Sequence, residues 1–323
     1  MKTSRNEASI RVLVTGATGN TGRHIASRLV ELGFTVRTAA RESRLADSTA
    51  EHVHFDWADT STHDAVLAGV DRMYLISPLA VEDPSVLMVP FIERALERGV
   101  RRVVLLSSSA IPEGSPGLGT VHRFLRERVP EWAVLQPSWF MQNFVNERHH
   151  QGASLKREGL LVTATGEGRV GFVDARDIAE VGVRALADEQ PHNTAHVITG
   201  PQALSYDDIA AVLSQVAGRP MRHVHVDSEG VQKHMMEAGI PERYAALLAQ
   251  LEEAIRQGAD GRVTQTVLRV TGREPRSFEA FARAHAAVWK GGAAELSAQQ
   301  VPAHLGSGHD RRHVHSQAGT GLG

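Results

Sequence analysis

The first clear pattern of hydrophobic and polar positions is an apolar run over residues 10–15 that leads into a glycine-rich segment. Such a run is typical of a buried strand. Apolar residues then recur every three or four positions over 21–32, which predicts a helix, and a glycine follows at position 33, where helices often end. Between the strand and the helix lie three glycines at G-x-x-G-x-x-G spacing, which are Gly16, Gly19 and Gly22.

A glycine-rich turn between a buried strand and a helix N-terminus is typical of a dinucleotide-binding loop. We expect Gly16 to permit the tight turn, Gly19 to let a pyrophosphate approach the backbone, and Gly22 to let the helix pack against the sheet. The free N–H groups at the helix N-terminus favour phosphate charge. The alternative is that the glycines serve backbone geometry alone. The residues predicted to contact the cofactor here are Gly16, Thr18, Gly19, Asn20, Thr21 and Gly22.

Strands and helices alternate along the rest of the first half of the chain. Apolar runs predict strands over residues 34–40, 52–57, 73–77, 103–106 and 133–136, and periodicity predicts helices over 64–69, 84–98 and 121–128. Residues 111–120 are rich in Gly, Pro and Ser, which predicts a loop. This alternation predicts an α/β fold of the Rossmann type, a doubly wound parallel sheet whose ligands bind at the carboxyl ends of its strands.

The end of the second predicted strand indicates which nicotinamide cofactor is bound. An acidic residue about 20 positions after the glycine motif binds the ribose 2′-hydroxyl of NAD, whereas an arginine there can bind the 2′-phosphate of NADP. Arg41 stands at this distance, and no acidic residue precedes it in the strand. We therefore predict NADP(H), with Ser43 as a second phosphate ligand. The alternative is a solvated arginine at a strand end.

Polar residues also follow the other predicted strands. Asp56 and Trp57 offer a hydrogen-bonding edge and a stacking face for an adenine. The remaining cofactor contacts expected at strand ends are Ser77, Pro78 and Ser107. Because the carboxyl ends of parallel strands meet at one edge of a sheet, these residues predict a single crevice.

Beyond residue 150 the alternation becomes irregular. The patterns predict an extended segment over 162–173, a helix over 177–187, strands over 196–199 and 222–226, and mainly helices to about residue 290. We expect a flexible N-terminus over 1–9, a Rossmann domain over 10–150 to which later strands return, a smaller C-terminal α/β substrate lobe mainly over 151–290, and a disordered tail over 291–323. Nothing in that tail orders its four histidines, so we predict no native metal site there or elsewhere: His304, His309, His313 and His315.

Composition excludes several classes of function. The 323 residues carry a formal net charge of −2 and 42% hydrophobic residues, so the chain can form a core and has no electrostatic basis for binding nucleic acid. It has no cysteine, which excludes disulfides and thiolate chemistry. No apolar run approaches the roughly 18 residues of a membrane span, and the polar start lacks a secretory signal pattern. We predict a cytoplasmic monomer or homodimer that binds neither membrane nor nucleic acid.

Several of these segments resemble those of a known family. The sequence from Val14 to Gly22, Arg41, the strand end at Ser107 and residues 173–179 are similar to the NmrA-like atypical short-chain dehydrogenases/reductases. Residues 136–143 resemble that family's segment after the sixth strand, and 271–281 resembles its festuclavine-dehydrogenase and triphenylmethane-reductase members. The resemblance covers roughly residues 10–290 and implies a Rossmann domain, a small substrate lobe and a bound nicotinamide cofactor, usually NADPH.

The chain departs from related dehydrogenases in lacking the Tyr-x-x-x-Lys pair, whose tyrosine protonates the substrate oxygen. Its three tyrosines, Tyr74, Tyr206 and Tyr244, are followed four positions later by proline, alanine and leucine. The helix expected to carry the pair, residues 121–128, offers His122 instead. A histidine can donate a proton near neutral pH, so His122 is the candidate catalytic residue. The alternative for His122 is a surface position or a contact with the cofactor amide.

The missing tyrosine favours one class of substrate. An iminium or strongly polarised double bond can accept hydride without a proton delivered in the same step, given correct orientation. We therefore predict an NADPH-dependent reductase that transfers hydride to a small aromatic or polycyclic imine, iminium or conjugated electrophile. The alternative is a non-catalytic NADP(H)-binding redox sensor of the NmrA type that acts through a protein partner.

Residues at the ends of the fifth and sixth predicted strands are candidates for the wall of a substrate pocket. The aromatic members suit a flat apolar substrate, but at helical spacing they can equally form the core of the lobe. The predicted pocket residues are Ser109, Trp139, Phe140, Met141, Asn143 and Phe144.

Overall fold

The structure, a computed structural model, describes residues 10–41, 50–78 and 81–290. The predictions made for residues 1–9, for Ser43 and for the tail over 291–323 lie outside these ranges. Within the described ranges, no helix combines the length and the apolar character needed to cross a lipid bilayer.

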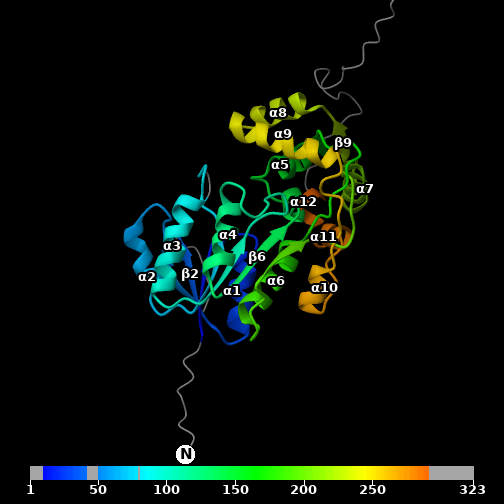
Figure 1. The fold of residues 1–323 in the computed structure, drawn as a ribbon. Helices are drawn as coiled ribbons and strands as arrows, with labels where there is room; N and C mark the ends of the chain where they lie inside the picture. The colour runs from blue at the N-terminus through cyan, green and yellow to red at the C-terminus, as the bar shows by residue number, and fades with distance from the viewer. Residues whose placement is uncertain (1–9, 42–49, 79–80, 291–323) are drawn as a thin grey trace, which may run out of the picture.

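A sheet of seven strands forms the centre of the larger part of the molecule (Figure 1). The strands are β1 (Arg11–Thr15), β2 (Thr35–Ala40), β3 (Glu51–His54), β4 (Arg72–Ile76), β5 (Arg102–Leu106), β6 (Glu131–Pro137) and β8 (Thr194–Ile198). Their order is β3-β2-β1-β4-β5-β6-β8, and every neighbouring pair is parallel. The order reverses between β1 and β4, where such sheets bind their ligands. The predicted α/β Rossmann fold is confirmed.

Helices cover both faces of this sheet (Figure 1). One face carries α1 (Gly22–Glu31), α6 (Ala175–Ala187) and α10 (Thr266–Thr271), and the other carries α2 (His63–Leu67), α3 (Ser85–Glu97) and α4 (Leu118–Arg128), with the 3-10 turn η1 (Thr60–Thr62) before α2. Successive residues of a strand point to opposite faces. Val12 and Leu13 of β1 are therefore both fully buried, in separate cores that contain Ile25 of α1 and Phe91 of α3 respectively. This is why the strand is a continuous apolar run.

The later part of the chain forms a smaller unit at the carboxyl edge of the sheet (Figure 1). It contains η2 (Met141–Phe144), α5 (His150–Arg157), β7 (Leu160–Thr163), α7 (Tyr206–Ala217), β9 (Arg222–His225), α8 (Ser228–Glu237), α9 (Glu242–Arg256), α11 (Phe278–Ala284) and α12 (Ala287–Lys290). β7 and β9 pair in parallel as a sheet of their own. Aromatic rings meet edge-to-face in its core, which is a geometry that aromatic pairs prefer. The rings are those of Phe144, Phe172, Tyr206 and Phe278.

Many predicted boundaries differ from the observed ones by one or two residues, and three elements differ by more. β3 ends at His54 rather than residue 57, because the Asp56 carboxylate accepts a hydrogen bond from the Ala58 N–H and turns the chain. α4 begins at Leu118, inside the predicted loop, directly after Gly117 with its φ of 74°. The extended segment predicted over 162–173 is a strand only to Thr163, followed by isolated bridges at Val170 and Val173.

Candidate functional site

The turn between β1 and α1 depends on two glycines in different ways. Gly16 has a φ of 62°, in the left-handed region that other residues rarely adopt, so the chain can turn sharply after Thr15. A Cβ on Gly22 would lie 2.3 Å from the carbonyl oxygen of Gly16. The missing side chain at position 22 therefore lets the first turn of α1 approach the end of β1.

Gly19 lies on the open side of this turn. Apart from its chain neighbours, the Gly16 carbonyl oxygen, 3.1 Å away, is the only atom of the described residues within 4 Å of an ideal Cβ at Gly19. The first N–H groups of a helix have no acceptor within the helix, so those of α1 can bind an anion that approaches past Gly19. Thr18 is exposed and Asn20 half-buried beside it. The turn fits the pyrophosphate of a dinucleotide, and the individual contacts remain predictions.

The side chain of Thr21 faces the protein interior rather than this open side. Its hydroxyl is 2.8 Å from the Tyr74 hydroxyl of β4, and both residues are almost completely buried. Burial raises the pKa of Tyr74 well above its usual range. Thr21 therefore joins α1 to β4 through its side chain, and only its backbone remains available to a phosphate.

The predicted cofactor residues at the second and third strands lie near each other. Arg41 is exposed just after β2, and its carbonyl oxygen is 3.1 Å from the His54 ring at the end of β3. Trp57 is half-buried, with its ring centroid 4.9 Å from that of Phe55. Asp56 uses its carboxylate in the turn after β3. Arg41 is thus an exposed cation at this strand end, whereas Asp56 and Trp57 also stabilise the local structure.

The ends of β4 and β5 lie side by side, because the two strands pair up to Ile76 and Leu106. Ser77, Pro78 and Ser107 follow directly and are half-buried. The Ser107 hydroxyl is enclosed and has no hydrogen-bond partner among the described residues. An enclosed hydroxyl without a partner is costly, so this strand end is suited to a bound polar group.

The segment after β6 combines core residues with partly exposed ones. Met141 and Phe144 lie in the 3-10 turn η2 and are buried in the core of the smaller unit. These two side chains therefore form part of the core, which was the alternative to a pocket wall. Trp139 and Phe140 are half-buried, and the Trp139 indole N–H donates to Asp260 at 2.9 Å. Asn143 is also half-buried. Ser109, another predicted pocket residue, is half-buried and donates its N–H to the carbonyl of Pro137 at 2.9 Å.

His122 lies on α4 with its side chain inside the core. The residue is 4% exposed, and its ring centroid is 5.8 Å from that of Trp132, near the amino-terminal end of β6. Its Nε2 lies 3.9 Å from Glu113, and its Nδ1 has no hydrogen-bond partner among the described residues. Burial lowers the pKa of His122, against the opposing effect of Glu113. A catalytic role for His122 remains a prediction, and this enclosed position gives it no direct support.

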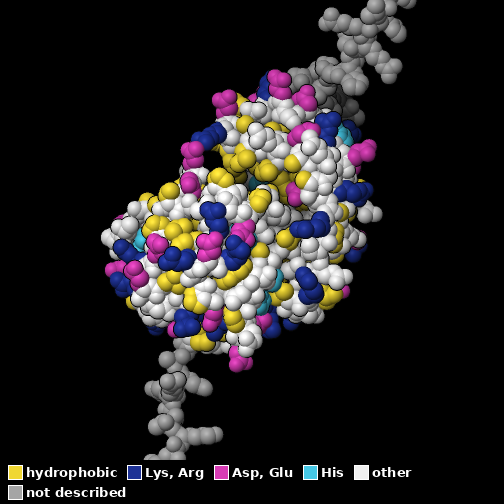
Figure 2. Space-filling view, in the orientation of Figure 1, with side chains coloured by type: hydrophobic (Ala, Val, Ile, Leu, Met, Phe, Trp, Pro, Cys, Tyr) yellow, Lys and Arg dark blue, Asp and Glu magenta, His cyan; other side chains and the backbone are white. Residues whose placement is uncertain are grey.

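A cavity that the sequence patterns did not indicate lies between α5, β7, α8 and α9. Its volume is about 570 Å³. Figure 2 shows apolar side chains gathered in the hollow beside α8 and α9. The cavity begins only a few residues after η2 along the chain, and an ion pair between Glu82 and Arg243, at 2.6 Å, joins the start of α9 to the segment after β4. Its polar lining residues are Glu147, Arg148, His149, His150, Ser154, Arg157, Glu158, His234, Glu237 and Tyr244.

Three histidines of this lining are held in the neutral form. Burial lowers the pKa of His149 to about 4 and that of His150 to about 3. Burial also lowers the pKa of His234. Nε2 of His150 and the hydroxyl of Ser154 are enclosed without a partner among the described residues. The adjacent histidines His149 and His150 were the one local signal of this site, but only the fold brings α8 and α9 over them.

Comparisons with known proteins agree with this architecture. Residues 8–282 match the model of the NmrA-like family. The uncharacterized oxidoreductase YesF of Bacillus subtilis (strain 168) is 48% identical over 279 residues, which cover 86% of this chain and 96% of that protein. Agroclavine dehydrogenase of Claviceps fusiformis is 35% identical over 285 residues, covering 86% and 98%. The triphenylmethane reductase of Citrobacter sp., solved with NADP(H), has a TM-score of 0.73 at 24% identity, covering 85% and 99%.

We predict that Gly19→Val abolishes dinucleotide binding while the protein stays folded. The new Cβ needs only a small adjustment of the Gly16 carbonyl, but the branched side chain fills the space left for a phosphate. Isothermal titration with NADPH and a thermal melt measure the two effects. The matched control, Ser27→Val on the exposed face of α1, should bind normally. Normal binding by folded Gly19→Val would place the phosphate elsewhere.

We predict that His150→Gln makes the protein less sensitive to acid. The unfolded chain protonates this histidine near pH 6.5 and the folded one near pH 3, so the free energy of unfolding falls as pH falls between these values. The variant should lower that slope by about 1.4 kcal/mol per pH unit. Urea unfolding between pH 6.5 and 4.5 measures it. An unchanged slope in His150→Gln contradicts the assignment.

Proposed function

The chain belongs to the NmrA-like family of atypical short-chain dehydrogenases/reductases and is an NAD(P)-dependent oxidoreductase, and from this premise we propose its reaction. NADPH is the cofactor, and the reaction transfers hydride to a small aromatic or polycyclic imine, iminium or conjugated electrophile. The similarity to an agroclavine dehydrogenase supports a small organic substrate.

The cavity between α5, β7, α8 and α9 is the observation on which the proposed substrate class rests. Its apolar lining includes Leu160, Val162 and Leu248, and Tyr244 adds an aromatic ring. Among its charged lining residues, Glu147 pairs with Lys156, and Glu158 lies 3.9 Å from Arg157. A concave site with an apolar wall and a few polar groups suits a small aromatic or polycyclic ligand.

The environment of the tyrosines supports a reaction without a tyrosine acid. Tyr74 and Tyr206 are completely buried, with hydroxyls held by Thr21 and Gln151. Tyr244 lies on the cavity wall, but Leu248, four positions later, takes the place of the lysine of a Tyr-x-x-x-Lys pair. Substrates whose product needs no proton in the same step suit this arrangement.

The chain's own residues bind and orient the reactants. The N-terminus of α1 holds the phosphates at Gly19, Arg41 pairs with a 2′-phosphate, and the Ser107 hydroxyl binds a polar group of the cofactor. NADPH, when bound, supplies hydride from C4 of its nicotinamide. Trp139 and Phe140, which are half-buried in the segment after β6, pack against the substrate beside the nicotinamide in this proposal. Orientation alone can lower a barrier by about 7–11 kcal/mol, enough for turnover without a proton donor.

We predict that the wild-type protein prefers NADPH over NADH by about ten- to a hundredfold, because a charge-assisted pair contributes about 1.5–3 kcal/mol. Arg41→Ala should remove the preference by weakening NADPH binding alone. Titration of both cofactors against both proteins measures it. Arg101→Ala, at an exposed arginine beside the amino-terminal end of β5, should keep the preference. Equal wild-type affinities would overturn the assignment of Arg41.

We predict that a cyclic iminium or cationic triarylmethane dye oxidises bound NADPH much faster than a ketone of matched size. A ketone yields an alkoxide that must be protonated, and the proposed reaction has no side chain positioned to donate that proton. Stopped-flow absorbance of NADPH measures both rates, with Gly19→Val as the control that lacks cofactor. Faster ketone reduction would overturn the mechanism. Tight NADP⁺ binding without oxidation by any electrophile would favour a redox sensor.

A further inference from the structure

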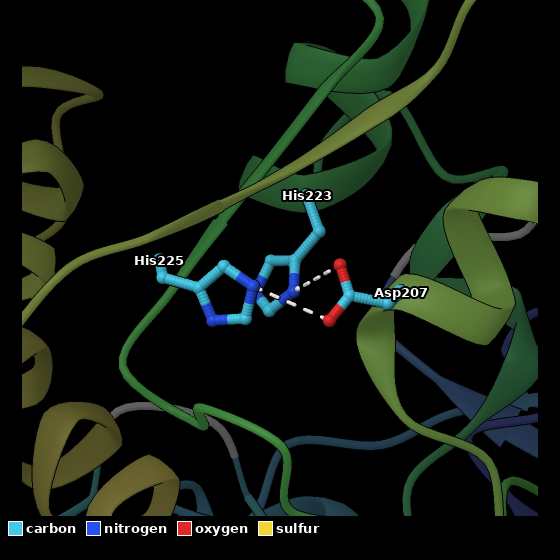
Figure 3. A group of neighbouring side chains, drawn as sticks. All are labelled: Asp207, His223 and His225. Atoms are coloured by element: carbon cyan, nitrogen blue, oxygen red, sulfur yellow. Dashed lines mark ion pairs between the residues drawn. The ribbon is translucent and has the colours of Figure 1, made fainter.

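Three side chains that can bind a metal ion meet on the smaller unit, in a group that we call the Asp207 cluster. Figure 3 shows its members, Asp207, His223 and His225, pointing toward one another. His223 and His225 are alternate residues of β9 and so lie on one face of that strand, and Asp207 lies in the first turn of α7. Each residue offers one ligand atom, and these atoms all lie within 4.8 Å of one another.

The separations of these atoms suit a tetrahedral ion. Nδ1 of His223 is 3.3 Å from one carboxylate oxygen of Asp207, and Nε2 of His225 is 3.3 Å from the other. In a tetrahedral site with metal–ligand bonds of about 2.0–2.2 Å, neighbouring ligand atoms are about 3.3–3.6 Å apart. Each imidazole nitrogen thus lies at this separation from a different oxygen of the Asp207 carboxylate, and one ligand atom from each residue lies within 4.8 Å of the other two.

Hydrogen bonds on the far side of His223 fix which of its nitrogens faces Asp207. Its Nε2 is 2.7 Å from the Thr163 hydroxyl, which also accepts the Thr165 N–H and lies 2.7 Å from the Thr165 hydroxyl. When the Thr163 hydroxyl donates to Thr165, its oxygen accepts the His223 proton at Nε2, and Nδ1 presents a lone pair toward the carboxylate. A second bond that orients a ligating histidine is a regular feature of metal sites.

The Nδ1 atom of His223 faces Asp207 in an enclosed position. The His223 side chain is completely buried, and its Nδ1 makes no hydrogen bond of good geometry among the described residues, although an Asp207 carboxylate oxygen is 3.3 Å away. With the ring proton on Nε2, Nδ1 and the carboxylate are both acceptors. A cation between them would satisfy both.

We propose that the Asp207 cluster binds a divalent transition-metal ion of the Zn²⁺ class. The ligands are Nδ1 of His223, Nε2 of His225 and a carboxylate oxygen of Asp207. Two imidazoles and one carboxylate suit zinc better than magnesium or calcium, which prefer oxygen ligands. The side chains of His225 and Asp207 are 49% and 53% exposed, so the ion enters from solvent and keeps a fourth position for water. The bound ion ties the first turn of α7 to β9.

The test measures Zn²⁺ affinity by competition with a chromophoric chelator. It uses the full-length chain with His304, His309, His313 and His315 changed to Gln, because those histidines can bind metal by themselves. We expect one Zn²⁺ per chain, a rise in melting temperature with Zn²⁺, and visible absorption bands of four-coordinate Co²⁺. His225→Gln and Asp207→Asn should each weaken binding at least tenfold and remove the Co²⁺ bands.

Two further variants separate ligand loss from other effects. Thr163→Val should weaken Zn²⁺ binding about tenfold by releasing the His223 ring. His54→Gln is the matched control. His54 is an exposed histidine at the last position of β3, just as His225 is an exposed histidine at the last position of β9. This variant should bind Zn²⁺ with the same affinity as the parent chain with the four tail substitutions. Zn²⁺ affinity that is unchanged in His225→Gln and Asp207→Asn, with all variants folded without metal, would overturn the site, as would the absence of binding in the background.

Discussion

The close approach of α1 to the end of β1 is the contact on which the cofactor crevice depends. The Gly16 carbonyl occupies space that any side chain at position 22 would need, at 2.3 Å from a Cβ built there. Only with this contact does the helix N-terminus lie beside the strand end. The buried bond between Thr21 and Tyr74 then joins the same helix to β4, across the point where the strand order reverses. Together these contacts hold two neighbouring strand ends and one helix end around a common opening.

The parts of the fold that the sequence predicts well are those set by neighbours along the chain. The strand–turn–helix at the glycines and the order of alternating elements follow from periods of two and 3.6 residues, which are local properties. The polar residues at strand ends could be assigned to one edge because parallel strands must run in the same direction. The Rossmann sheet is confirmed on this basis.

The parts that escaped prediction depend on contacts between distant segments. Apolar residues such as Met141 and Phe144 have the same sequence pattern whether they line a pocket or form a core. Only their packing in one cluster with Phe172 and Tyr206 shows that they belong to the core. The sequence pattern presents His122 as a polar position on a helix, but in the fold the residue is buried and its ring lies against Trp132. The cavity and the Asp207 cluster are completed only by the packing of separate elements, α8 and α9 over α5 in the one and α7 against β9 in the other, so the adjacent or alternate histidines of each are a weak signal by themselves.

The ion pair between Glu82 and Arg243 has a consequence for how the two parts of the molecule separate. Both side chains are mostly exposed, at 74% and 82%, so dissolved salt can screen their attraction. Ionic attraction between solvated charges falls off over about 10 Å at 0.1 M salt, and over shorter distances as salt rises. The contact between the start of α9 and the segment after β4 is thus partly a force that ionic strength controls, and concentrated salt weakens it.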